Sequence, residues 1–251
     1  MKIAVIPKYL ASLGSAVALA YAMPGRADTI ATWSFEAGQN SALATASVTS
    51  ASTGPIASDV GVGYASGTHA TASQWSAPAG DANAAYPSSV HSLSANTWAV
   101  GDYFQFTVNP DLGNYTYSGI QLSWDQTGSN TGPRTFGLYY STDGSTYTLA
   151  GSDYQLSFFS WNTSTVAGNH ESADLSADTG LNTASTMYFR VVDDSNDGLS
   201  INGGSIATGG TDRIDNFTVT ATLTPVPEPT SAALLSGFVG LLAWNMLRRR
   251  S

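Results

Sequence analysis

The sequence predicts an all-β fold: a β-sandwich or jelly roll, preceded by a signal peptide and followed by one transmembrane helix. Apolar and polar residues alternate with a period of two in several short segments, and Gly, Asn and Asp-Gly interrupt these segments at close intervals. No segment before the C-terminal tail keeps a helical period of 3.6 residues. We therefore expect residues 28–224 to form one large domain with a substantial core.

The expected strands are recognised by a shared apolar face. They are marked, in chain order, by Trp33 and Phe35, then by 103–108, 120–124, 136–140, 147–149, 187–192 and 217–223. In the second of these, Phe104, Phe106 and Val108 belong to one face. Asp143-Gly144 separates two alternating runs, which predicts a hairpin because both residues tolerate positive φ.

Two further regions complete the body. The run 187–192 is apolar on both faces except at Arg190, which predicts a central strand. Residues 40–100 are rich in Ala, Ser, Thr and Gly and carry scattered aromatic side chains. We expect short strands and long loops there, without a second domain.

The N-terminus is typical of a secretory signal peptide, expected to cover 1–27. Two lysines precede an apolar stretch, 10–20, that is too short to span a membrane. Cleavage sites with small residues lie after Ala22 and after Ala27. The second is favoured because the first strand is expected to begin near Thr29.

The C-terminus, 225–251, combines three features in a fixed order. Closely spaced prolines make 225–229 an extended spacer that cannot form a helix. Residues 230–247 are apolar and near the short limit for a spanning helix. The terminal cluster Arg248, Arg249 and Arg250 predicts a cytoplasmic end, which leaves the body outside.

The motif Pro227-Glu228-Pro229, the apolar span and the arginine cluster together resemble the PEP-CTERM sorting tail of Gram-negative bacteria. This resemblance implies processing by the membrane-embedded exosortase, after signal peptidase has removed the N-terminal segment. It also implies export through an inner-membrane intermediate, held by the C-terminal helix, to the cell surface or the extracellular matrix.

The body is similar to a recurring type of PEP-CTERM ectodomain. The matching stretches are 33–36, 98–107, 138–144 and 213–217. Those proteins resemble jelly rolls that are related in shape to carbohydrate-binding modules. The resemblance implies the fold and, more distantly, an association with extracellular polysaccharide.

Charge is scarce and unevenly distributed. Charged residues make up 11% of the chain, under half the usual share of roughly 25%. Between Thr29 and Leu247 there is no lysine, and the three arginines are Arg134, Arg190 and Arg213. Residues 29–224 hold sixteen acids, so their net charge is about −13. This excludes a basic nucleic-acid-binding surface, and the absence of cysteine excludes disulfides and thiolate metal sites.

A structural calcium ion is expected where the first and last strands meet, by resemblance to calcium-binding modules of this shape. Glu36 and Asp215 are the expected ligands, with Asp212 as a third, because calcium takes oxygen ligands. A break in the alternation predicts a β-bulge at Asp215-Asn216 that re-aims these side chains. The alternative is that Asp215 pairs with Arg213 or with solvent.

A weaker calcium candidate lies in the segment 193–198. Asp193, Ser195 and Asp197 occupy alternate positions before a glycine, as in the first half of a calcium-binding loop. The position where such a loop needs a bidentate glutamate is Gly204. The alternative is an acidic surface loop that leaves a central strand.

Catalytic motifs are absent from the sequence. There is no nucleophile elbow, zinc-protease motif or P-loop, and no two acids can be singled out as glycosidase carboxylates. Trp75, Tyr86 and Trp161 have loop-like contexts and are candidates for stacking on sugar rings, with packing over the sandwich ends as the alternative.

We therefore expect a non-enzymatic surface or matrix protein that associates with polysaccharide. The alternatives are a polysaccharide-active enzyme, either a glycoside hydrolase or a lyase, and a purely structural surface protein.

Overall fold

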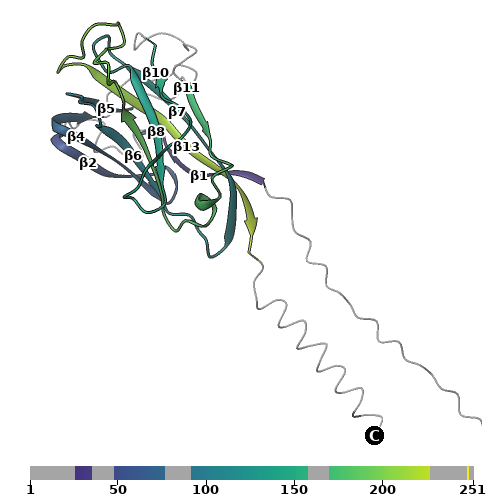
Figure 1. Ribbon diagram of the computed structural model, residues 1–251. Helices are drawn as coiled ribbons and strands as arrows, with labels where there is room; N and C mark the ends of the chain where they lie inside the picture. Colours follow the sequence, from purple (N-terminus) through teal and green to yellow (C-terminus); the bar gives the residue numbers. More distant parts are fainter. Residues whose placement is uncertain (1–25, 36–47, 77–91, 158–169, 227–247, 249–251) are drawn as a thin grey trace, which may run out of the picture.

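The computed structural model describes residues 26–35, 48–76, 92–157, 170–226 and 248 (Figure 1). Apart from the short 3-10 turn η1, Thr179–Thr183, the elements formed by the described residues of the body are all β-strands, as the alternation predicts. They are β1 Arg26–Trp33, β2 Val48–Ala57, β3 Val60–Gly61, β4 Gly63–Ser76, β5 Leu93–Asn96, β6 Tyr103–Val108, β7 Tyr115–Gly128, β8 Thr135–Ser141, β9 Thr148–Leu149, β10 Tyr154–Gln155, β11 His170–Asp174, β12 Met187–Asp193 and β13 Thr211–Pro225.

The strands pack as two antiparallel layers, the arrangement of a β-sandwich (Figure 1). In the first layer the order is β2, β4, β6, β12 and β8, and β9 and β10 lie along the outer edge of β8. In the second layer β7 and β11 lie on one side of β13, and β5, β1 and β3 lie on the other. The end of β4 pairs with β5 and so joins the two layers.

Aromatic residues from both layers fill the space between them. Phe106 of β6 stacks on Phe217 of β13 with ring centres 3.7 Å apart. Trp33 of β1 meets both rings edge-on, at 5.2 and 6.1 Å. All three side chains are fully buried, so this cluster joins the layers through the hydrophobic effect.

Several strand predictions are confirmed. The run 103–108 is β6, and its residues alternate between buried and half-buried. The central strand expected at 187–192 is β12, which pairs with β6 on one side and β8 on the other. The hairpin predicted at Asp143-Gly144 joins β8 to β9, and Gly144 has the positive φ that it requires, 72°.

Other expectations differ from the structure. The first strand begins at Arg26, earlier than expected, because β13 continues far enough to pair with it. Within 40–100, β2 and β4 are long strands where short ones were expected. β4 has β2 on one side and β6 on the other, and such tertiary pairing overrides the weak strand propensity of Ala, Ser and Gly.

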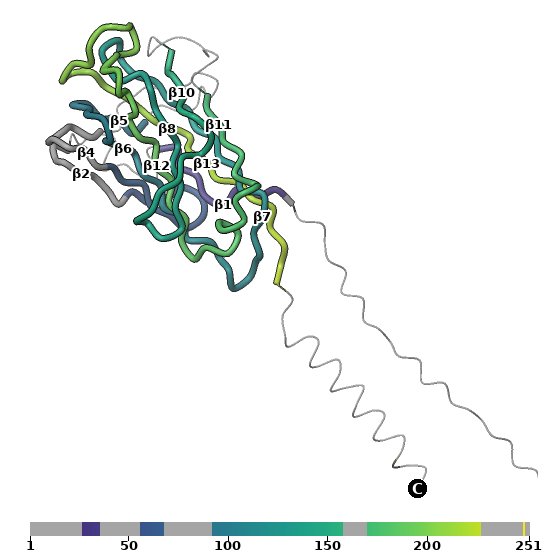
Figure 2. The backbone as a smooth tube through the Cα atoms, viewed as in Figure 1, coloured from purple at the N-terminus to yellow at the C-terminus, as the bar shows by residue number. Residues whose placement is uncertain are grey.

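The beginning of β1 and the end of β13 lie at the same end of the sandwich (Figure 2). Arg26 pairs there with Leu223. The opposite end carries the loops 129–134 and 194–210, and we call it the distal end. These two loops are bonded to each other through backbone groups, for example from Ile201 N–H to the Gly132 carbonyl at 3.0 Å.

In the part of the chain that the structure describes, no helix has the length and apolar character needed to cross a membrane. The spanning segment expected at 230–247 and residues 1–25 of the expected signal peptide lie outside that part.

Candidate functional site

The outer face of the first layer carries tyrosines from four neighbouring strands and a turn. Strand register places Tyr188 of β12 beside Thr107 of β6, which is next to Tyr64 of β4. The adjacent row contains Tyr139, Arg190 and Gln105. We call this surface the tyrosine face, and its tyrosines are Tyr64, Tyr103, Tyr139, Tyr147 and Tyr188.

Arg190 is held at the centre of this face by two aromatic rings. Its guanidinium carbon lies 4.0 Å from the ring centre of Tyr103 and 3.8 Å from that of Tyr147. Arg190 Nε–H donates to Gln105 Oε1 at 2.8 Å, and the Tyr147 hydroxyl donates to the same oxygen at 3.2 Å. Cation–π attraction and these shared hydrogen bonds fix the orientation of both rings.

The β8–β9 turn covers one part of the tyrosine face. A Cβ at Gly144 would lie 3.1 Å from Tyr188 Cζ, so the glycine permits close contact with the ring. Asp143 accepts hydrogen bonds from the backbone N–H of Thr146 and Ser145, both at 2.8 Å, and these bonds hold its pKa below the ordinary value. The turn is therefore a fixed part of the face.

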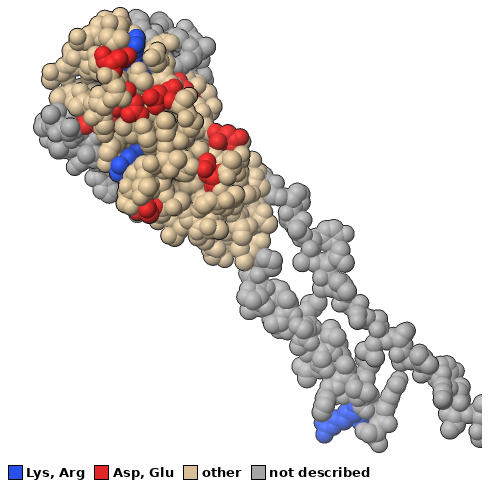
Figure 3. Space-filling model, in the orientation of Figure 1, with Lys and Arg blue, Asp and Glu red and all other residues tan. Residues whose placement is uncertain are grey.

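The tyrosine face is accessible and weakly charged. Tyr64 is 46% exposed, and the other four tyrosines are half-buried. Figure 3 shows a mostly uncharged surface on which acidic side chains outnumber basic ones. The sequence carried a signal for this face, because Tyr103 and Gln105 alternate with buried phenylalanines in β6.

The carboxylates of Asp153 and Asp194 both lie close to Gly137, beside the tyrosine face. A Cβ at Gly137 would lie 2.5 Å from Asp194 Oδ2 and 3.0 Å from Asp153 Oδ1, so these oxygens are within about 5.5 Å of each other. The Tyr139 hydroxyl donates to Asp194 Oδ2 at 2.9 Å. Burial, together with the nearby Asp153 charge, raises the pKa of Asp194. Burial and the bond to Asp194 raise the pKa of Tyr139 to about 12.

The β-bulge predicted at Asp215-Asn216 is confirmed. The register between β13 and β7 shifts there, and Asn216 has a φ of 50°. Asp215 lies directly opposite Asp125 of β7, and both aspartates are fully buried. Asp125 contacts His170 Nδ1 at 2.6 Å and accepts a bond from Asn216 Nδ2–H at 2.9 Å.

Asp215 and Asp212, two of the three expected calcium ligands, have different surroundings in the structure. Asp215 gains Asp125 as a carboxylate neighbour, and this oxygen-rich pair is of the type that calcium prefers. Asp212 belongs to a separate network, in which it accepts a hydrogen bond from Gln126. Glu36 lies outside the described residues, among which no group of three metal-ligating side chains occurs. A calcium ion at Glu36 and Asp215 stays a prediction.

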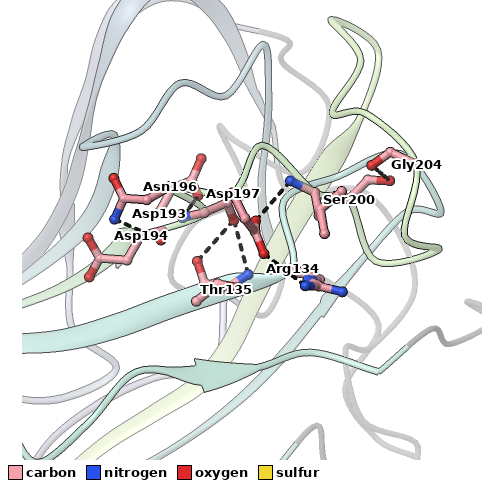
Figure 4. Close-up of polar contacts among 10 residues, drawn as sticks. Arg134, Thr135, Asp193, Asp194, Asn196, Asp197, Ser200 and Gly204 are labelled. Carbon is pink, nitrogen blue, oxygen red and sulfur yellow. Dashed lines mark hydrogen bonds and ion pairs between the residues drawn. The ribbon is translucent and has the colours of Figure 1, made fainter.

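In the weaker calcium candidate, the side chains hold the turn itself (Figure 4). Asp193 Oδ1 accepts from Ser195 N–H at 2.9 Å, and Ser195 Oγ accepts from Thr135 N–H at 3.0 Å. Asp197 pairs with Arg134 at 2.8 Å. The three side chains thus bond to different partners. Asp193 and Ser195 are buried, so only the exposed Asp197 agrees with the alternative of an acidic surface loop.

The aromatic residues chosen as stacking candidates lie elsewhere. Trp75 is in β4, where it pairs with Val48 and Ala95, and is not in a loop. Tyr86 and Trp161 lie outside the described residues, as do the sorting residues Pro227, Glu228, Pro229, Arg249 and Arg250. The tyrosine face, built from regular strands, was missed because residues that could stack on sugar rings were sought in loop-like segments.

No family model matches the chain, and no curated protein matches its sequence. Among solved structures, the chain is similar to two cleaved adhesin domains of Lys-gingipain from Porphyromonas gingivalis W83. The K1 domain gives a TM-score of 0.31 and 14% identity over 58% of this chain and 82% of that domain. The K3 domain gives a TM-score of 0.30 and 10% identity over 53% of this chain and 74% of that domain.

The chain is also similar to endoglucanase 3 of Trichoderma harzianum, from family GH12. The TM-score is 0.25 and the identity 12%, over 79% of this chain and 98% of the enzyme. Similarities of this size carry no conclusion about family or function.

Proposed function

We propose that this chain is an exported, non-enzymatic surface or matrix protein with a jelly-roll body that binds a neutral polysaccharide through the tyrosine face. The observation that carries the proposal is the set of five tyrosines on one accessible face, with Arg190 and Gln105 fixed among them. Tyrosine rings offer apolar surfaces on which sugar rings stack, and their hydroxyls bond to sugar hydroxyls.

The charge of the body determines the kind of polysaccharide. A body with a net charge of about −13 repels acidic polymers. Within the tyrosine face, Arg190 is the cationic group, and it is engaged by Tyr103, Tyr147 and Gln105. Stacking on a neutral chain is therefore better suited to this face than ionic contact with an acidic one.

A glycan array tests the binding proposal. The full chain, purified in mild detergent, is applied to neutral and acidic glycans together with the Tyr64→Ala and Tyr115→Ala variants. Tyr64 is in the tyrosine face, whereas Tyr115 is on β7 of the other layer. Signal on neutral glycans that falls for Tyr64→Ala and persists for Tyr115→Ala supports the proposal, and silence across the array contradicts it.

The sorting proposal rests on the sequence. The signal peptide, the Pro-Glu-Pro motif, the apolar span and the terminal arginines support export and exosortase processing. Glu228→Ala is expected to leave a larger, membrane-retained form, visible by immunoblotting of cell fractions. Equal size and location of variant and wild type would argue against exosortase recognition.

A second candidate function, polysaccharide cleavage, is favoured by Asp153 and Asp194. The upper limit of about 5.5 Å on the distance between their nearest oxygens permits the roughly 5–5.5 Å found between carboxyl groups in retaining glycosidases. The raised pKa of Asp194 suits a general acid. Release of reducing sugar by the wild type that disappears in Asp194→Asn would establish this activity.

A further inference from the structure

Two buried carboxylates lie at the distal end of the sandwich, one in each layer, and they are close enough for the charge of Asp193 to raise the pKa of Asp212. Asp193 is the last residue of β12 in the first layer, and Asp212 is near the start of β13 in the second. Both side chains are 0% exposed. The loop 194–210 leaves the first layer at one of them and enters the second layer at the other.

Each aspartate retains one oxygen without a partner. Among the described residues, Asp193 Oδ2 and Asp212 Oδ2 are fully buried and accept no hydrogen bond. Their other oxygens are satisfied, since Ser195 N–H donates to Asp193 Oδ1 and Gln126 Nε2–H donates to Asp212 Oδ1, both at 2.9 Å. A buried carboxylate oxygen without a partner is strongly destabilising unless something compensates it.

The surroundings hold the Asp212 carboxylate in place. Gln126 Oε1 accepts bonds from the Tyr154 hydroxyl and from Trp124 Nε1–H, which fixes the amide that binds Asp212. Across the strand pair, a Cβ at Gly128 would lie 3.3 Å from Asp212 Oδ2 and 2.5 Å from Ile201 Cδ1. The glycine is therefore needed for the carboxylate and the loop residue to approach this closely.

The cations of the folded body do not neutralise both charges. Residues 29–224 contain three arginines and no lysine. Arg134 pairs with Asp197, and Arg190 is held in the tyrosine face. Arg213 acts on Asp212, but the charges that act on Asp193 come from Asp102 and Asp194, and Asp193 and Asp212 also repel each other. The arginines of residues 29–224 therefore leave Asp193 without a compensating positive charge, which a bound cation could supply.

We propose that a hard divalent cation, Ca²⁺, binds between Asp193 and Asp212 and joins the two layers at the base of the loop 194–210. The unpartnered atoms are both carboxylate oxygens, which are calcium ligands. Calcium tolerates irregular coordination, whereas magnesium requires a near-ideal octahedron. The site is separate from the tyrosine face. It differs from the calcium ion expected at Glu36 and Asp215, for which Asp212 was the third expected ligand, because it pairs Asp212 with Asp193.

Thermal unfolding of the full chain tests this site. After treatment with EGTA and dialysis at pH 7.5, CaCl₂ at about a hundredfold excess over its Kd should raise Tm by roughly 5–10 °C. Asp193→Asn and Asp212→Asn should each remove most of this rise. Asp197→Asn, which changes an exposed carboxylate of the same loop, should retain it.

A direct binding measurement decides the case if the asparagine variants do not fold. Tb³⁺ added to the wild type should emit on tryptophan excitation, because Trp124 is linked to Asp212 through Gln126, and Ca²⁺ should quench that emission by displacement. The proposal is overturned if neither CaCl₂ nor Tb³⁺ binds. It is also overturned if Asp193→Asn and Asp212→Asn both fold and keep the full rise in Tm. A third contradicting result is a wild-type Tm that does not change with calcium together with two asparagine variants that are more stable than the wild type, because the aspartate pair would then hold a proton.

Discussion

Arg190 stacks on Tyr103, with its guanidinium carbon 4.0 Å from the centre of the ring. Both residues lie on the outer face of the first layer, on the paired strands β12 and β6. The ring centre of Tyr147 lies 3.8 Å from the same guanidinium carbon. This group of three connects the β8–β9 turn to the sheet and gives the tyrosine face a fixed shape.

Arg190→Lys should lower the free energy of unfolding by about 1–2 kcal/mol, because lysine keeps the charge but loses the planar group that stacks on two rings. Urea denaturation followed by fluorescence measures the change. Arg134→Lys is the matched control, since Arg134 makes an exposed ion pair and should change stability little. An Arg190→Lys variant as stable as the control would contradict the role assigned to this stack.

Phe217→Ala should lower the free energy of unfolding by about 3–5 kcal/mol, the usual range for removing a buried phenylalanine. Phe217 is fully buried and contacts the rings of Phe106, Trp33 and Phe189, which come from both layers. Denaturant unfolding with Phe217→Leu as the milder comparison checks this. A loss below about 1 kcal/mol would mean that the layers are not held together at this cluster.

Stability without calcium should decrease as the pH rises from about 4 toward 7. Burial is the first cause that raises the pKa of Glu171, Asp193, Asp194 and Asp212 above the ordinary values of 4.5 and 3.8. The folded state then holds protons that the unfolded state has lost, so the stability present at low pH is lost as pH rises through the folded pKa values.

Exposed carboxylates give the opposite dependence of stability on pH, and their effect should be smaller. Hydrogen bonds lower the pKa of Asp143, Asp174 and Asp197, so their contribution is lost as pH falls instead. Urea denaturation in EGTA at several pH values measures the net effect, and a stability that increases from pH 4 to 7 would contradict it. Added calcium should reduce the decrease, because it binds the ionised form of Asp193 and Asp212.

The mature chain should begin at Met23. Arg26 and Ala27 pair with Leu223 and Thr222 in the sandwich, and cleavage after Ala22 keeps these two pairs whereas cleavage after Ala27 removes them. We therefore expect cleavage after Ala22, although the sequence analysis favoured cleavage after Ala27. Mass spectrometry of the exported protein locates its N-terminus, and a chain that begins at Asp28 would refute this preference.

Period-two alternation was enough to predict β6, β8 and β13, because one face of each strand is buried in the core. β12 was predicted from a run that is apolar on both faces except at Arg190. The bulge at Asp215-Asn216 was also visible, as a break in that alternation. Alternation could not give the length of β2 and β4. Their small residues form strands because β4 pairs with β6 on one side and with β2 on the other.

The candidate sites were harder to predict because they depend on which strands become neighbours. Tyr64, Tyr103 and Tyr188 are far apart in the sequence and meet through the pairing of β4, β6 and β12. Asp193 and Asp212 were noticed as members of different candidate sites. Their proximity follows from the crossing of the loop 194–210 between the layers, which no local pattern shows.

Binding of a neutral glycan by the tyrosine face is the central claim, and isothermal titration of Tyr64→Ala against Tyr115→Ala tests it most directly. The ligand is the neutral oligosaccharide that gives the strongest array signal. Removing one exposed stacking ring should weaken binding about fivefold to tenfold, close to 1 kcal/mol. The account predicts this loss for Tyr64→Ala and an unchanged Kd for Tyr115→Ala. Equal Kd values for Tyr64→Ala and the wild type would contradict it.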